Sequence, residues 1–144
     1  QGSLLPQCSP LGPVVDRAPP HTAVHKDFDD FLSGYIECIL WSESRNEAGD
    51  NYETGGHRLT RGAKAAMERD CRDFWDAQQV DLKLYLKSGR DIAHAGHDFC
   101  LTRTRHGAGF WDRGLGELGD RLTAASQAYG EQSLYTSGVW IYTH

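Results

Sequence analysis

The strongest constraint on the fold is a stripe of large apolar side chains between residues 26 and 41. The stripe recurs every three or four positions, so one face of a helix is too apolar to remain in water. Its members are Phe28, Phe31, Leu32, Tyr35, Ile36 and Ile39. Asp27 is a suitable N-cap, and Gly34 leaves room for another element to approach closely. The pattern predicts a helix over residues 26–41 that packs against a core.

Two further helical patterns follow along the chain. Apolar residues from Ala63 to Tyr85 keep steps of three and four, which predicts a helix over residues 61–87, either continuous or broken near Gln78. Thr60 is placed to cap its start. A third stripe, over residues 115–129, predicts a helix that Gly130 ends.

Strands are predicted in two places. Residues 97–105 alternate between apolar and polar side chains, and residues 107–109 supply a glycine-rich turn, after which residues 110–112 are expected to return as a second short strand. Residues 96–113 would then form a hairpin. A second hairpin is expected where two aromatic-rich segments flank residues 136–138. The predicted fold is α+β, with about three helices packed on a small antiparallel sheet.

The first 25 residues differ from the rest. They contain all five prolines of the 144-residue chain, which predicts an extended arm because proline fixes φ and lacks an N–H donor. Residues 1–3 resemble the remnant of a cleavable tag. We expect a single α+β domain over residues 26–144, a length that can bury a substantial core.

Composition excludes several classes of function. The net charge of −5 disfavours nonspecific binding to nucleic acid, which needs clustered Lys and Arg. No apolar run is long enough to span a membrane, and no signal peptide is visible. Four cysteines (Cys8, Cys38, Cys71 and Cys100) form no C-x-x-C pair, which favours reduced thiols over a disulfide framework and a cytoplasmic location. No cofactor motif is present, so no cofactor is expected.

Ionisable and aromatic side chains are concentrated in residues 96–113. This segment holds two histidines, two aspartates, three arginines and a Phe-Trp pair. A long polar loop at residues 42–58 is the second candidate region, since loops of this length are uncommon unless they are functional or disordered. Tryptophan and arginine often anchor interfaces, so binding is the first hypothesis. The candidate binding residues are Arg103, His106, Trp111, Asp112 and Arg113, with Asp50, Asn51 and Tyr52 of the loop.

The same segment carries a family resemblance. Residues 96–99 (Gly-His-Asp-Phe), 101–103 (Leu-Thr-Arg) and 106–114 (His-Gly-Ala-Gly-Phe-Trp-Asp-Arg-Gly) resemble a family of small proteins of unknown function encoded mainly by bacteriophages and prophages. The resemblance covers about residues 28–135. It implies a phage context, in which the chain acts by binding a host or phage protein in the cytoplasm of the infected cell.

Three other interpretations of the segment remain open. The first is a small hydrolase, metal-assisted or not, whose polar centre is His97, Asp98, His106 and Asp112. The strand prediction weighs against a shared metal ion, because it separates His97 from His106 by about 30 Å. The second is single-stranded nucleic-acid binding by the arginines and by the Phe-Trp pair. The third is a structural network, in which Asp98 or Asp112 pairs with Arg103 or Arg113 above core aromatics.

Overall fold

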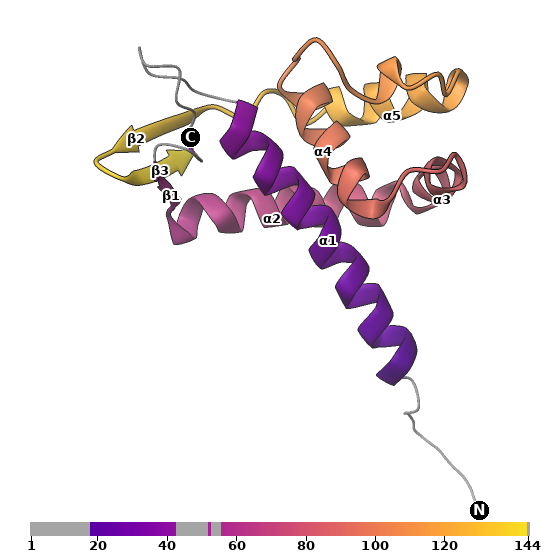
Figure 1. Cartoon of the computed structure of the whole chain (residues 1–144), viewed down its shortest axis with the longest axis horizontal. Helices are drawn as coiled ribbons and strands as arrows, with labels where there is room; N and C mark the ends of the chain where they lie inside the picture. The colour runs from indigo at the N-terminus through magenta and orange to yellow at the C-terminus, as the bar shows by residue number, and fades with distance from the viewer. Residues whose placement is uncertain (1–17, 43–51, 53–55, 144) are drawn as a thin grey trace, which may run out of the picture.

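The computed structural model describes residues 18–42, 52 and 56–143. Within these residues the chain is mostly helical, with five α-helices, one 3₁₀ turn and a three-stranded sheet (Figure 1). The elements are α1 (Ala18–Ser42), β1 (Arg58–Leu59), α2 (Arg61–Ala77), α3 (Gln79–Lys87), α4 (Ile92–Arg103), η1 (Phe110–Asp112), α5 (Glu117–Gln127), β2 (Leu134–Ser137) and β3 (Trp140–Thr143). The α+β class is confirmed, with five helices in place of about three.

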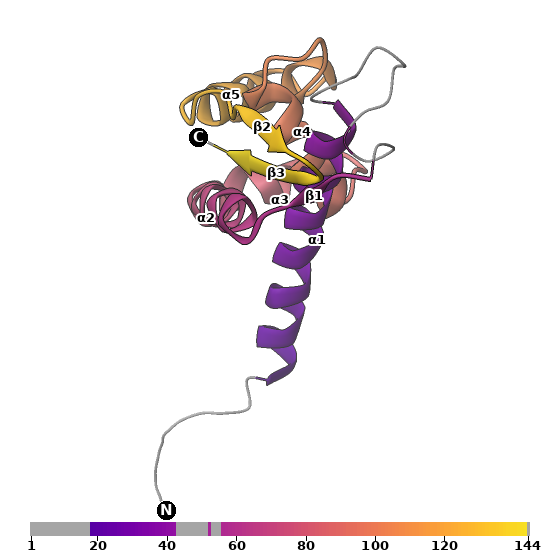
Figure 2. The ribbon, with the colours of Figure 1, turned by 90° about the vertical axis from the view of Figure 1, so that its left-hand side faces the viewer.

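Helix α1 is longer than the apolar stripe predicted. It begins at Ala18, so residues 18–25, expected to be extended, are helical. Pro19 and Pro20 lie in the first turn, where proline is tolerated because the N–H groups have no partner within the helix anyway. The predicted stripe lies against the core, and the N-terminal half of α1 extends beyond the other helices (Figures 1 and 2).

Helices α1 and α4 pack with their backbones in direct contact. A Cβ added to Gly34 would lie 2.0 Å from the carbonyl oxygen of Ala93, and one added to Gly96 would lie 2.0 Å from that of Phe31. No other residue type fits at either position without moving a helix. The close approach expected at Gly34 is confirmed.

The predicted strand over residues 97–105 is wrong, because these residues belong largely to α4. Asp91 caps this helix by accepting a hydrogen bond from the backbone N–H of His94 at 2.8 Å. Residues 98–103 are all buried, since α1, α5 and η1 pack around this helix. Because residues 98–103 are buried on every side, this part of the helix has no exposed polar face to give a 3.6-residue period, so the local alternation was misleading.

The end of α4 turns the chain back on itself. The N–H of His106 donates to the carbonyl of Leu101 at 3.0 Å, and that of Arg105 donates to Thr102 at 3.3 Å, which is the Schellman pattern. Arg105 adopts a φ of 60° at this turn. Residues 110–112 then form η1, not a strand, so the predicted hairpin over residues 96–113 is a helix, a tight turn and a 3₁₀ turn.

The sheet is mixed, not antiparallel. The predicted C-terminal hairpin is confirmed as β2 and β3, while β1 adds to β3 in parallel with Leu59 opposite Ile141. Thr60 links β3 to the start of α2. Its hydroxyl donates to the carbonyl of Ile141 at 2.9 Å, and it accepts from the N–H of Ala63 as the expected cap of α2. Figure 2 shows the sheet beside the first turns of α2.

The core is an aromatic stack between α1, α2 and α4. The rings of Phe74 and Phe99 lie 4.1 Å apart at their centroids, and Phe31 stacks on both at 6.0 Å. Helix α3 is separate from α2, so the alternative with a break near Gln78 is the correct one. The three described cysteines, Cys38, Cys71 and Cys100, are buried thiols that form no disulfide, as predicted.

Candidate functional site

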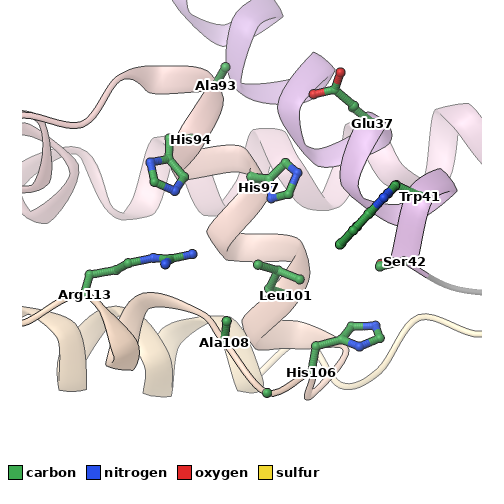
Figure 3. A pocket seen from close by; sticks show the side chains of 11 residues that line it. Glu37, Trp41, Ser42, Ala93, His94, His97, Leu101, His106, Ala108 and Arg113 are labelled. Atoms are coloured by element: carbon green, nitrogen blue, oxygen red, sulfur yellow. The ribbon is translucent and has the colours of Figure 1, made fainter.

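A cavity of about 770 Å³ lies between α1, α4 and the turn that follows α4. We call it the histidine pocket. Its lining residues are Glu37, Trp41 and Ser42 of α1, Ala93, His94, His97 and Leu101 of α4, and His106, Gly107, Ala108 and Arg113 of the following segment. Figure 3 shows His94 and Arg113 at one end, Trp41 and His106 at the other, and His97 between them.

The expected separation of His97 from His106 is wrong. A helix rises about 1.5 Å per residue instead of the ~3.3 Å of a strand, so α4 is short. The Schellman turn then returns His106 alongside Leu101, one turn beyond His97. His94 precedes His97 by three positions and faces the same cavity. Three imidazoles therefore line one pocket.

A buried carboxylate, that of Asp98, lies behind the end of the pocket where His94 and Arg113 are found. Asp98 has no exposed surface, and Arg113 donates to it from Nη2 at 2.7 Å and from Nε at 3.2 Å. Tyr85 of α3 donates to the second oxygen at 2.7 Å, and His94 Nε2 lies 3.9 Å from the first. The predicted pairing of Asp98 with Arg113 is confirmed, and it aims Arg113 along the pocket wall.

The pocket lining brings three imidazoles and one guanidinium together, and Asp98 is the counterion of the guanidinium. Arg113 carries a fixed charge, and its hydrogen bond with Asp98 raises the pKa of the guanidinium further. A hydrogen bond with the Cys38 thiol, followed by the nearby carboxylates, raises the pKa of His97 and favours the imidazolium. Glu37 is the one acidic residue in the lining. The Trp41 ring, 48% exposed, stands 6.4 Å from the ring of His97 and adds an aromatic wall.

Arg103 lies away from the pocket. It is 5% exposed, and its guanidinium donates to the carbonyl of Gly130 at 2.7 Å and to the hydroxyl of Tyr35 at 3.1 Å. Asp70 of α2 completes the arrangement at 2.8 Å. The side chain therefore faces the protein interior and holds three segments together.

The remaining candidate residues are dispersed. Trp111, 50% exposed, and Asp112 face solvent outside the pocket lining. Trp111 is consequently not the core aromatic that the structural interpretation expected, whereas Phe110 is fully buried. Tyr52 is 8% exposed and packs edge-on against the ring of His57 at 5.3 Å. Asp50 and Asn51, the other two loop candidates, lie outside the described residues.

The candidate metal ligands do not converge. In the described part of the chain, no three His, Cys, Asp or Glu side chains are arranged to hold an ion. Of the four candidates, His97 and His106 line the pocket, Asp98 is held by Arg113, and Asp112 is exposed. This geometry gives no support to a metal centre at those four residues.

The α1 contribution to the pocket was not anticipated. Glu37, Trp41 and Ser42 lie near the end of α1, next to but off the apolar stripe. The available signal was Trp41 itself, a large aromatic side chain that the helical stripe does not bury. Only the packing of α1 on α4 shows that it faces histidines.

No helix in the described residues is both long and apolar enough to span a bilayer. Comparison of the chain with models of protein families, with curated proteins and with solved structures finds no match in any of the three.

Proposed function

We propose that the chain acts by binding, and that the histidine pocket takes a small ligand with an anionic group next to an aromatic or apolar part. The observation that carries this proposal is the convergence of His94, His97, His106 and Arg113 on one cavity. Its volume of about 770 Å³ falls in the range of small-ligand sites.

Each part of such a ligand would contact side chains of complementary chemistry in the pocket. Imidazolium and guanidinium groups are strong donors to phosphate or carboxylate oxygens, and His97 is biased toward its charged form by Cys38. Trp41, at the end of the pocket away from Arg113, and Leu101 of α4 offer apolar surface. The resemblance to phage-encoded proteins supports a role in the cytoplasm of an infected bacterial cell.

Phenyl phosphate is a probe that combines both features, and phenol is its neutral counterpart. In an NMR titration we expect phenyl phosphate to shift the ring signals of His94, His97 and His106, and to leave His57 unchanged because it lies outside the lining. Phenol should bind more weakly. Equal responses to the two probes, or no response from the three pocket histidines, would contradict the proposal.

Tryptophan variants provide a matched comparison. Trp41→Ala should weaken phenyl phosphate binding about tenfold, which is ~1.4 kcal/mol. Trp140→Ala removes a side chain of nearly the same exposure, 47% against 48%, outside the pocket and should leave affinity unchanged.

Trp111→Ala tests the expected protein partner, since Trp111 lies on the surface that such a partner would contact. Capture of a partner from infected-cell lysate that requires Trp111 but not Trp41 would favour protein binding over the small-ligand proposal.

A small hydrolase is the second candidate, and the His94–Asp98 contact at 3.9 Å favours it. A general base gains from a buried carboxylate that orients its ring, and His94 has such a partner one helical turn away. We expect hydrolysis of 4-nitrophenyl phosphate by the wild-type chain, and its loss in His94→Ala. Nitrophenolate release no faster than in buffer alone would exclude this activity for that substrate class.

A further inference from the structure

Two cysteine thiols lie together behind the histidine pocket. Cys38 follows Gly34 by four residues on α1, and Cys100 follows Gly96 by four residues on α4, so each lies one helical turn beyond the point where the two backbones touch. Both side chains are fully buried and free of disulfides. The Cys100 thiol lies within hydrogen-bonding reach of the Cys38 thiol.

The Cys38 thiol also contacts the pocket wall. His97 forms a hydrogen bond with it, and the hydroxyl of Ser42 lies 4.0 Å from its sulfur. His97 and Ser42 both line the pocket, and His97 is only partly buried. These two side chains therefore stand between the Cys38 sulfur and the pocket.

The surroundings of Cys38 favour its thiolate. The titratable groups that face it are Cys100 and His97, both on α4; their hydrogen bonds outweigh burial and lower the pKa of Cys38 to about 6. Cys71 provides the contrast within the same chain. It is equally buried, but burial without such partners raises the pKa of its thiol. Of these two buried thiols, only Cys38 has surroundings that favour the thiolate.

We infer that Cys38 and Cys100 form a redox-active dithiol, which a hydroperoxide oxidises to a disulfide between α1 and α4. The Cys38 thiolate attacks one peroxide oxygen, the O–O bond breaks, and Cys38 becomes a sulfenic acid. The departing oxygen takes a proton from the His97 imidazolium and leaves as water or an alcohol. The Cys100 sulfur then attacks the Cys38 sulfur, the S–O bond breaks, and the Cys100 proton leaves with hydroxide as water. Two thiols are oxidised, and one peroxide bond is reduced.

The test uses the full chain with Cys8→Ser, which removes the cysteine outside the described residues. After treatment with hydrogen peroxide at neutral pH, nonreducing peptide mapping by mass spectrometry should find Cys38 linked to Cys100 and Cys71 still reduced. In a Cys100→Ala variant, Cys38 should remain a sulfenic acid that dimedone captures. In a Cys38→Ala variant, Cys100 should stay a thiol.

Alkylation by iodoacetamide measures the reactivity of the Cys38 thiol independently of the peroxide reaction. Alkylation of Cys38 should reach half its maximal rate near pH 6, and His97→Ala should move that midpoint upward. Cys71 should react far more slowly across the same range. Reaction of Cys38 no faster than Cys71, a disulfide joining any other pair, or peroxide oxidation of Cys100 in the Cys38→Ala variant would each overturn the inference. Melting curves identify any variant that has lost its fold, and the peptide map of the Cys8→Ser chain does not depend on the other variants.

Discussion

At the scale of single residues, Asp98 shows how this chain places charge inside a helical core. Its carboxylate is fully buried, yet Arg113 and Tyr85 each contact it at 2.7 Å and His94 lies near it. A buried charge is tolerated when its partners replace the water it has lost. Asp98 therefore ties η1 and α3 to α4, and it sets the direction in which Arg113 enters the pocket.

Removing this charge should cost far more than removing an exposed one. Asp98→Asn leaves the Arg113 guanidinium without its counterion, and we expect the free energy of unfolding to fall by about 3 kcal/mol. Asp30→Asn breaks the Lys26 pair, whose side chains are 73% and 45% exposed, and should cost less than ~0.5 kcal/mol. Urea unfolding measures both. Similar losses for the two variants would show that Asp98 is not a structural anchor.

Arg105 is a residue in a conformation that suits glycine. It is the one non-glycine residue with positive φ in the described part of the chain, at the C′ position of the Schellman turn. Its ion pair with Glu131 at 3.6 Å is exposed and should contribute little.

Arg105→Gly should therefore stabilise the fold. We expect the free energy of unfolding to rise by up to about 1 kcal/mol, because relief of the left-handed strain exceeds the added entropy of the unfolded chain. Arg105→Ala also loses the ion pair but keeps the strain, so it should change stability little. A destabilised glycine variant, measured by urea unfolding, would refute the assignment of strain.

At the scale of elements, the contact of α1 with α4 organises the molecule. It brings the backbones together at Gly34 and Gly96, and it places the α1 side of the histidine pocket opposite the α4 side. The same contact sets the two buried thiols beside each other. Any change that separates these helices should disturb both features.

Gly96→Ala tests this contact directly. The added methyl group would meet the Phe31 carbonyl at 2.0 Å, so we expect a loss of about 3 kcal/mol in the free energy of unfolding and weaker binding of phenyl phosphate. The matched control is Gly62→Ala in α2, where nothing lies within 4 Å and helix propensity predicts a gain of up to about 1 kcal/mol. Equal stability of the two variants would contradict the close packing.

At the scale of the whole molecule, Arg103 connects segments that are far apart in sequence. From α4 it contacts Tyr35 of α1, Asp70 of α2 and the carbonyl of Gly130 beyond α5. Tyr35 in turn donates to Gln132, which leads into the C-terminal hairpin. The Arg103 side chain thereby connects α1 and α2 with the segment that leads into the C-terminal hairpin.

Arg103→Ala should destabilise the domain as a whole. Loss of the guanidinium leaves Asp70, the buried Tyr35 hydroxyl and the Gly130 carbonyl without their donor, so we expect a decrease of about 3 kcal/mol, on the order of other broken buried pairs. Arg121→Ala removes an exposed arginine paired with Asp81 and should cost less than about 1 kcal/mol. Thermal unfolding followed by circular dichroism distinguishes them. Equal melting temperatures would show that Arg103 is free to serve another role.

Elements whose signals are local were predictable from the amino-acid sequence. The stripe of α1, the Thr60 cap and the C-terminal hairpin depend on neighbours within a few positions, so their patterns are visible in the chain, whereas the break before α3 was only one of two alternatives. Close approach at Gly34 was predictable for the same reason. Of the pocket, the sequence identified His97, His106 and Arg113 as candidates but not the cavity they share.

Helix α4, strand β1 and the pocket depend on contacts between segments that are distant in sequence. The second half of helix α4 is covered on all sides, so residues 98–103 lack the polar face that reveals a helix, and their alternation resembled a strand. Strand β1 has two residues and exists because β3 pairs with it. The pocket forms because the turn after α4 returns His106 toward His97 and α1 brings Trp41 opposite. These contacts join residues distant in sequence, and no local pattern encodes them.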